Sequence, residues 1–332
     1  MLARFSGANF ELQNDLSNCS VATAGMSNST SLPPGIKVFE RGWLSANNIL
    51  FSSGQTTALV DSGYCTHSNQ TVQLVEKALG GRTLDFLVNT HLHSDHCGGN
   101  AALQAQFPLL KTFIPPGLAE HVRQWDPSAL TYVPTGQECP KFEIHGVLGG
   151  GAQIQLADRL WEVHAAPGHD AHSIILFEPD SRALISADAL WENGFGVVFQ
   201  ELEGDRAFDE VSATLDLIED LDPLPVIPGH GRVFSNTNLA LTTARRRLDG
   251  FLADPCKHAT HAAKVLLKFK LLEAHQLPMP ALLQWARATP YFDLIHQRWF
   301  ADQALGAWLE HTIQALCLSG ALELHNDMVI NR

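Results

Sequence analysis

The sequence of 332 residues lacks the patterns of a membrane protein and of a disulfide-stapled secreted domain. No window approaches the run of about 18 apolar residues that a membrane-spanning helix requires. The six cysteines are widely separated and form no C-x-x-C pair, so we expect reduced thiols. Residues 1–32 lack a basic start followed by an apolar stretch, which argues against a secretory signal. We therefore expect a cytoplasmic protein, although a Ser-rich leader of this kind is also compatible with organelle targeting.

Positive charge is scarce in the first two thirds of the chain. Residues 1–234 hold 12 Lys and Arg against 27 Asp and Glu, whereas residues 235–332 hold 10 against 8. An acidic surface repels phosphate backbones, so the bulk charge does not favour a nucleic-acid partner. The run Arg245-Arg246-Arg247 is interpreted as the solvated face of a helix. We expect a small-molecule substrate and no membrane partner, with a homodimer as an open alternative to a monomer.

The pattern of apolar and polar residues divides the chain into three parts. Residues 1–34 have little periodicity and end in Leu-Pro-Pro-Gly, which predicts a flexible extension. Residues 35–235 alternate short apolar runs with amphipathic segments, and residues 236–332 are mostly helical with a final hairpin. The last part resembles a winged helix. Its few basic residues favour a structural or dimer-forming role over nucleic-acid binding.

Periodicity places the individual elements. Helices are predicted at residues 68–79, 98–107, 117–124, 207–220, 238–253, 257–274, 279–288 and 301–319. Strands are predicted at 36–39, 48–51, 57–60, 84–88, 111–114, 141–147, 152–156, 160–165, 173–178, 182–186 and 226–227, with a terminal pair at 322–324 and 328–330. The triple glycine at 149–151 precedes a strand rather than a helix, so it predicts a turn and not a phosphate-binding loop.

Histidines crowd the end of one apolar strand. Residues 90–96 read Thr-His-Leu-His-Ser-Asp-His, which places three imidazoles and a carboxylate within six positions. Such groups compete for hydrogen bonds and suffer desolvation when they are packed together, whereas a divalent cation makes each a favourable ligand. His91 and His93 alternate and point to one side of an extended segment, while Asp95 and His96 lie at the turn into a helix. This pattern predicts a metal site.

The segment matches the H-x-H-x-D-H signature of the metallo-beta-lactamase superfamily, and the sequence resembles that family from about residue 36 to 235. Further motifs follow in the family's order, namely Val-Asp-Ser-Gly, Ala-Pro-Gly-His-Asp, Ser-Ala-Asp-Ala and Pro-Gly-His-Gly. The resemblance implies seven ligands for two ions: His91, His93, Asp95, His96, His169, Asp188 and His230. It gives one ion to His91, His93 and His169 and the other to Asp95, His96 and His230, with Asp188 between them. Asp61 is implied to orient a ligand or the loop.

The resemblance also implies a fold and a reaction. The expected fold is of the α/β (α+β) class, a four-layer αββα sandwich with a small C-terminal helical, winged-helix-like domain. Two divalent ions per chain are expected, Zn²⁺ first and Fe or Mn as alternatives, because imidazole and carboxylate ligands suit all three. Ions about 3.5–4 Å apart would hold a bridging hydroxide that attacks the substrate. Asp95 or Asp188 is expected to handle the proton.

Residues next to the ligands carry weaker hypotheses. His172 follows His169 by three positions and matches a histidine of lactonase-like and endoribonuclease-like branches, so a catalytic role and a structural role both stay open. Cys97 is interpreted as a small buried thiol. Trp43, Trp191 and Phe195 are candidates for lining the pocket, although aromatic residues at loop ends more often pack a core.

The resemblance leaves several functions open. We expect hydrolysis of a thioester, lactone or other carboxylic ester, in the manner of glyoxalase II-like and lactonase-like branches. The scattered basic residues of the C-terminal part do not match the glutathione-binding tail of glyoxalase II. A metal-dependent nuclease or phosphodiesterase acting on RNA is the first alternative, and a non-catalytic metal-binding regulatory protein is the second.

Overall fold

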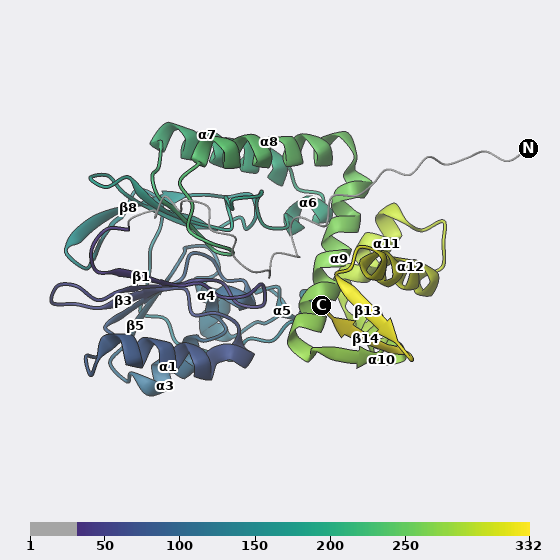
Figure 1. Ribbon diagram of the computed structural model, residues 1–332, viewed down its shortest axis with the longest axis horizontal. Helices are drawn as coiled ribbons and strands as arrows, with labels where there is room; N and C mark the ends of the chain where they lie inside the picture. Colours follow the sequence, from purple (N-terminus) through teal and green to yellow (C-terminus); the bar gives the residue numbers. More distant parts are fainter. Residues whose placement is uncertain (1–31) are drawn as a thin grey trace, which may run out of the picture.

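Two β-sheets packed face to face form the centre of the molecule, whose computed structural model describes residues 32–332 (Figure 1). The first sheet has the order β1-β2-β3-β4-β5-β6, with β1 Ile36–Phe39, β2 Asn48–Phe51, β3 Ala58–Val60, β4 Phe86–Val88, β5 Lys111–Ile114 and β6 Gly146–Val147. The second has the order β11-β10-β9-β8-β7, with β7 Gln153–Leu156, β8 Arg159–Ala165, β9 Ile174–Glu178, β10 Ala183–Ala187 and β11 Val226–Pro228. Both sheets mix parallel and antiparallel pairs.

Alternating side chains of the strands fill separate layers. In β3, Ala58 and Val60 face the second sheet and pack around Trp161, whereas Leu59 faces outward. In β9, Leu176 points inward and Phe177 outward. Successive residues of a strand point to opposite faces, so the apolar residues on both faces of β3 and β9 require cover on both sides of each sheet.

Helices provide that cover on the two outer faces (Figure 1). Helices α1 (Ser68–Leu79) and α3 (Asn100–Gln106) pack on the first sheet, and α7 (Ala207–Leu221) and α8 (Thr237–Ala253) pack on the second. The four layers of the predicted αββα sandwich are therefore confirmed.

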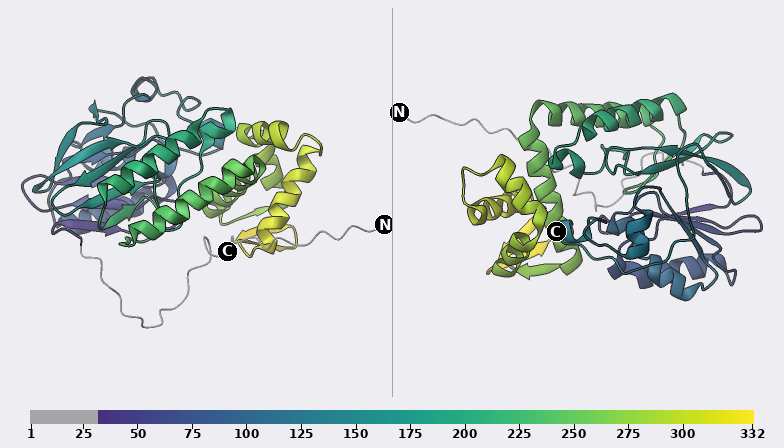
Figure 2. Two further views of the ribbon diagram at one scale, coloured as in Figure 1. Left: turned by 90° about the horizontal axis from the view of Figure 1, so that it is seen from above. Right: turned by 180° about the vertical axis from the view of Figure 1, so that it is seen from behind.

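The C-terminal part stands at one end of the sandwich (Figures 1 and 2). It consists of α9 (Pro255–Ala274), α10 (Met279–Ala288), α11 (Pro290–Trp299) and α12 (Leu305–Leu318) with a small sheet of β12 (Gln276–Pro278), β14 (Met328–Asn331) and β13 (Leu322–His325). Asp254 accepts a hydrogen bond from Lys257 N, and Pro255 occupies the first turn, which starts α9 in a new direction. Helix α9 thereby runs across the end of both sheets.

The packing adds detail to the predicted division of the chain. Leu241 and Leu248 of α8 belong to the outer core of the second sheet, whereas Leu267 of α9 packs with α10, α11 and α12. The boundary at residue 235 stays a prediction, and the change of packing partners falls at Asp254. The predicted extension lies outside the described residues except for its last three positions.

Two local predictions differ from the structure. The strand predicted at 141–147 is reduced to Gly146–Val147, which forms β6 and pairs in parallel with β5 before the chain crosses to β7 in the other sheet. Helix α11 was not predicted. The remaining short helices are η1 Cys65–His67, α2 Ser94–Cys97, α4 Ala119–Gln124, α5 Tyr132–Thr135 and α6 Phe199–Glu203. Within residues 32–332, each helix is too short or too polar to cross a bilayer.

Candidate metal centre

The loop after β4 and the short helix α2 carry the first four site residues. The buried strand ends at Val88, and His91 lies in the loop with no exposed surface. His93 has an extended backbone with ψ 147° directly before α2, and α2 then turns Asp95 and His96 in a different direction. The carbonyl of Asp95 accepts a hydrogen bond from Ala46 N at 2.9 Å, which ties α2 to the segment before β2. The short segment from His91 to His96 thus directs its side chains in two different directions.

His91, His93 and His169 form the first group. One ring nitrogen of each residue lies within 4.8 Å of those of the other two. His93 Nδ1 lies 2.8 Å from His169 Nε2, and the Nδ1 of His169 lies 2.7 Å from the carbonyl oxygen of Val197. Since that carbonyl can only accept, His169 carries its proton on Nδ1 and presents the lone pair of Nε2 to the group.

Asp95, His96, Asp188 and His230 form the second group. His230 Nε2 lies 3.0 Å from Asp95 Oδ2, and His96 Nε2 lies 3.4 Å from Asp188 Oδ1. His230 comes from the loop after β11, where Gly229 allows a close approach: a Cβ at Gly229 would lie 2.1 Å from Asp188 Oδ1. The Pro-Gly-His motif therefore needs glycine for space at the site.

Asp188 lies between the two groups, directly after β10. Its Oδ2 is 3.5 Å from Nε2 of His169 and 3.7 Å from Nε2 of His230. The preceding residue, Ala187, has a φ of 47°, a conformation that residues with a Cβ rarely adopt. Strain of this kind persists where surrounding contacts fix the backbone, and here it sets the direction of the carboxylate.

Asp61 does not line the pocket but accepts hydrogen bonds from Thr90 and His96, next to the two groups. At the end of β3, its Oδ1 accepts from Thr90 N at 2.9 Å, and its Oδ2 accepts from Thr90 Oγ1 and His96 Nδ1, each at 2.8 Å. A carboxylate that accepts from Nδ1 fixes the tautomer of His96 and directs Nε2 toward the second group. Asp61 itself has φ 57°, which an Asp residue tolerates better than most.

Burial and local charge set the protonation of the rings. Burial lowers the pKa of His169 to about 4, and burial together with the neighbouring His96 and His93 holds the pKa of His91 well below its usual value. Against the effect of burial, Asp188, Asp61 and Asp95 raise the pKa of His96 well above its usual value. His91 and His169 of the first group therefore favour the neutral form, whereas His96 of the second group favours a positive charge beside its carboxylates.

The residues fit a pair of divalent cations. Within residues 32–332, the buried Nε2 atoms of His91 and His96 have no hydrogen-bond partner. An unpaired buried nitrogen is unfavourable unless something binds its lone pair. A cation in the second group would replace the proton that the carboxylates attract to His96. Imidazole and carboxylate donors within 4.8 Å of one another match the ligand types of Zn²⁺, Fe and Mn.

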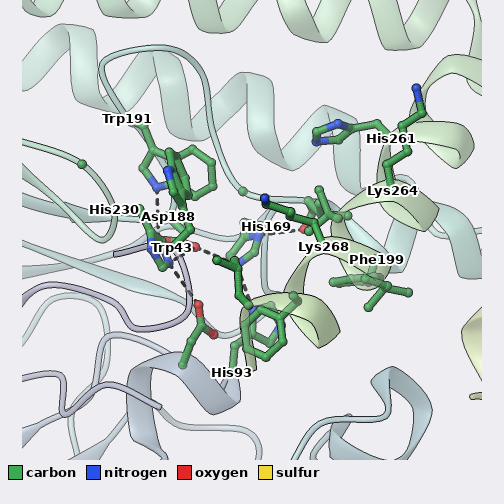
Figure 3. A pocket seen from close by; sticks show the side chains of 18 of the residues that line it. Trp43, His93, His169, Asp188, Trp191, Phe199, His230, His261, Lys264 and Lys268 are labelled. Atoms are coloured by element: carbon green, nitrogen blue, oxygen red, sulfur yellow. Dashed lines mark hydrogen bonds and ion pairs between the residues drawn. The ribbon is translucent and has the colours of Figure 1, made fainter. Parts of the chain in front are cut away.

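A pocket opens onto both groups (Figure 3). His93, Asp95, His169, Asp188 and His230 line its metal-binding end. The opposite wall comes from α9 and neighbouring segments, and its lining residues include Val197, Phe199, Arg247, His261, Lys264, Val265, Lys268, Phe269 and Leu272. Sequence reasoning missed this wall because α9 has helical periodicity but no motif that indicates proximity to residues 90–96.

The neighbours of the ligands separate into two classes. Trp43 and Trp191 line the pocket, whereas Phe195 is buried against Phe251 and does not line it. His172 is exposed, and its ring packs against Gly117 away from the pocket lining. The geometry does not support a catalytic role for His172, which stays a prediction.

Cys97 is fully buried, as expected. Its sulfur lies 3.2 Å from the hydroxyl of Tyr132, and burial raises its pKa well above the usual value. It therefore packs at the end of α2 in the apolar cluster around Tyr132 and does not supply a thiolate to either group.

A family model of the metallo-beta-lactamase superfamily matches residues 41–230. The chain belongs to this superfamily. The match runs from the loop after β1 to His230 after β11, so it includes every residue of both groups. This metallo-beta-lactamase superfamily protein is a hydrolase with a His/Asp metal-binding site.

Named relatives extend the comparison. The chain is 27% identical over 222 residues to a hydroxyacylglutathione hydrolase of Brucella anthropi, which covers 66% of this chain and 71% of the relative. A hydroxyacylglutathione hydrolase of Brucella ovis is 27% identical over 218 residues, covering 64% and 70%.

Solved structures share the fold. A metallo-beta-lactamase family protein from Thermus thermophilus aligns with a TM-score of 0.55 at 16% identity, covering 91% of this chain and 100% of that chain. A beta-lactamase domain protein from Burkholderia ambifaria aligns with a TM-score of 0.55 at 18% identity, covering 91% and 94%. Both alignments reach beyond the sandwich into the C-terminal part.

Proposed function

We propose that the chain is a dinuclear metal-dependent hydrolase that acts on the carbonyl group of a thioester, lactone or other carboxylic ester. The observation that carries this proposal is one pocket with two unlike ends, a double ligand group at one and a largely apolar wall on α9 at the other. Such a pocket suits a small acyl compound, whose apolar part packs on the wall while its carbonyl lies at the ligand groups.

Each ligand group would hold one of the two metal ions. His91, His93 and His169 would hold one ion, Asp95, His96 and His230 the other, and Asp188 would contact both. The bound ions would polarise the carbonyl oxygen and lower the pKa of water at the site toward about 7. Asp95 or Asp188, which both line the pocket, would accept the proton of the attacking water.

The relatives support an acyl substrate. Their name, hydroxyacylglutathione hydrolase, describes hydrolysis of a hydroxyacyl derivative of glutathione. The α9 wall carries Val265, Phe269 and Leu272 beside Lys264 and Lys268, so it offers apolar surface on which an acyl chain can pack. Glutathione thioesters are therefore one class of compound to be tested as substrates, beside other thioesters, lactones and esters.

A substrate panel tests the proposal. Purified protein loaded with Zn²⁺, Mn²⁺ or Fe²⁺ is assayed against acyl thioesters, lactones, simple esters and RNA, before and after removal of metal by a chelator. We expect turnover of at least one carbonyl substrate, loss of turnover on chelation, and recovery when metal returns. RNA cleavage with a steep salt dependence and no carbonyl turnover would replace the proposal with a nuclease. Full metal loading with no turnover at all would favour a regulatory protein.

A further inference from the structure

Two tryptophans flank the second ligand group (Figure 3). The Trp43 ring lies parallel to His230, with centroids 5.5 Å apart and an interplanar angle of 8°. Trp191 meets His230 edge-on, at 5.5 Å and 76°, and meets Trp43 at 5.3 Å and 69°. The two indoles have comparable ring contacts with His230, so packing against that histidine does not distinguish them.

A hydrogen bond distinguishes them. Trp191 Nε1 donates to Asp188 Oδ1 over 3.1 Å. The other oxygen, Oδ2, lies 3.5 Å from His169 Nε2 and 3.7 Å from His230 Nε2, so it faces both ligand groups at once. The two carboxylate oxygens therefore have separate surroundings: Oδ1 faces a fixed donor and His96, and Oδ2 faces the space between the groups.

We propose that Trp191 is a positioning residue, whose indole N–H holds Asp188 Oδ1 so that Oδ2 stays directed at both ligand groups. This inference rests on the proposed dinuclear centre. The terminal torsion of an Asp side chain is broad, so a carboxylate without such a donor samples orientations in which Oδ2 leaves the midpoint. An indole N–H suits the task, because it can only donate and it adds no charge to a site that must accept two cations.

The backbone around Trp191 fixes the donor. Trp191 N donates to Gly194 O at 2.7 Å, and Gly196 N donates to Asp188 O at 2.9 Å, so the ligand and its donor belong to one closed turn. Gly194 has a φ of +124°, a conformation essentially restricted to glycine. The backbone that carries both Asp188 and the indole is therefore fixed by this turn.

The test compares Trp191→Phe with Trp43→Phe. Both substitutions keep an aromatic ring near His230 and remove one indole, but only Trp191→Phe removes a hydrogen bond to the carboxylate. The zinc content of each full-length protein is measured, together with the two zinc dissociation constants by competition with a chromophoric chelator. Circular dichroism and thermal unfolding of the metal-free proteins establish that both variants fold.

We expect Trp191→Phe to weaken the lower-affinity zinc site by about 10- to 100-fold, the range typical for loss of an outer hydrogen bond to a ligand. Trp43→Phe should stay within about threefold of the unsubstituted protein, because it leaves that bond in place. Equal zinc affinities in the two folded variants would overturn the inference. If the unsubstituted protein binds no second zinc ion, the proposed dinuclear function fails as well, and this result is distinct from equal affinities at two filled sites.

Discussion

The two ends of the pocket differ in how their side chains are held. At the metal-binding end, Asp188, His169 and His230 are buried, and the backbone has unusual φ angles at Ala187, directly before Asp188, and at Asp61, which supports His96. On the α9 wall, Val265 and Phe269 are half-buried on a regular helix. Rigid, buried polar groups suit the reacting centre, and adaptable apolar groups suit substrate selection. The difference predicts that substitutions at the two ends alter different quantities.

The largest effect is expected for Asp188→Ala at the metal-binding end. Loss of the carboxylate that faces both groups should abolish binding of at least one zinc ion and reduce kcat/KM by about 1000-fold or more. Elemental analysis and steady-state kinetics on the best ester of the panel measure both quantities. The control is Asp209→Ala, which removes an exposed carboxylate from α7 and should change neither. Normal zinc content and turnover in Asp188→Ala would show that the site is misassigned.

The metal-binding end was also the more predictable from sequence. Residues 91–96 indicate it directly, because a strand end crowded with imidazoles has few explanations other than metal. His169, Asp188 and His230 also follow strands, and strand ends from two packed sheets meet at one edge, so an ordered set of motifs suffices to join them. Trp191 was noted only as a possible lining residue, because its bond to Asp188 depends on the turn that Gly194 closes.

The α9 wall could not be predicted, for a physical reason. Its position depends on the direction in which the chain leaves α8 at Asp254 and Pro255, and this direction is set by packing with α10, α11 and α12. Helix α11 was itself missed: it starts at Pro290 directly after α10, and Thr289 separates the two in an extended conformation. Periodicity identifies a helix far better than it identifies what the helix faces.

A smaller effect at the metal-binding end is expected for Asp61→Asn. Asn tolerates the φ of 57° as well as Asp does, so the backbone is kept while the negative acceptor for His96 Nδ1 is lost. Zinc affinity should fall about 10- to 100-fold. Asp85→Asn is the matched control, since Asp85 accepts similar bonds from Thr57 at the opposite end of β4. An equal change in zinc affinity in both variants would assign the effect to folding.

On α9, the strongest expected effect concerns stability. Burial, with a smaller contribution from Arg247, lowers the pKa of His258 to about 4, and the ring packs between Phe208 and Phe251. The unfolded chain titrates near pH 6.5, so it binds more protons than the folded chain between about pH 6.5 and pH 4. Stability is therefore lost as pH falls through this window, and His258 accounts for about 2 kcal/mol of the loss between pH 7 and pH 5.

Urea unfolding of the metal-free protein at pH 7 and pH 5 measures this contribution. In His258→Leu, the difference in unfolding free energy between the two pH values should shrink by about 2 kcal/mol. The exposed His325→Gln should keep the full difference. An unchanged difference in His258→Leu would show that its ring is not held neutral in the folded state.

The smallest effect, and the sharpest contrast between the two ends, is expected for Phe269→Ala. Phe269 lines the pocket from α9 and its ring meets Tyr64 edge-on at 5.1 Å, so zinc content should stay at the value of the unsubstituted protein. Loss of the ring removes apolar surface from the wall, which should lower kcat/KM about 10-fold for long-chain acyl esters and leave acetyl esters nearly unchanged. Leu239→Ala on the exposed face of α8 is the control. A uniform loss across all chain lengths would place Phe269 with the reacting centre, and the division between the two ends would not hold.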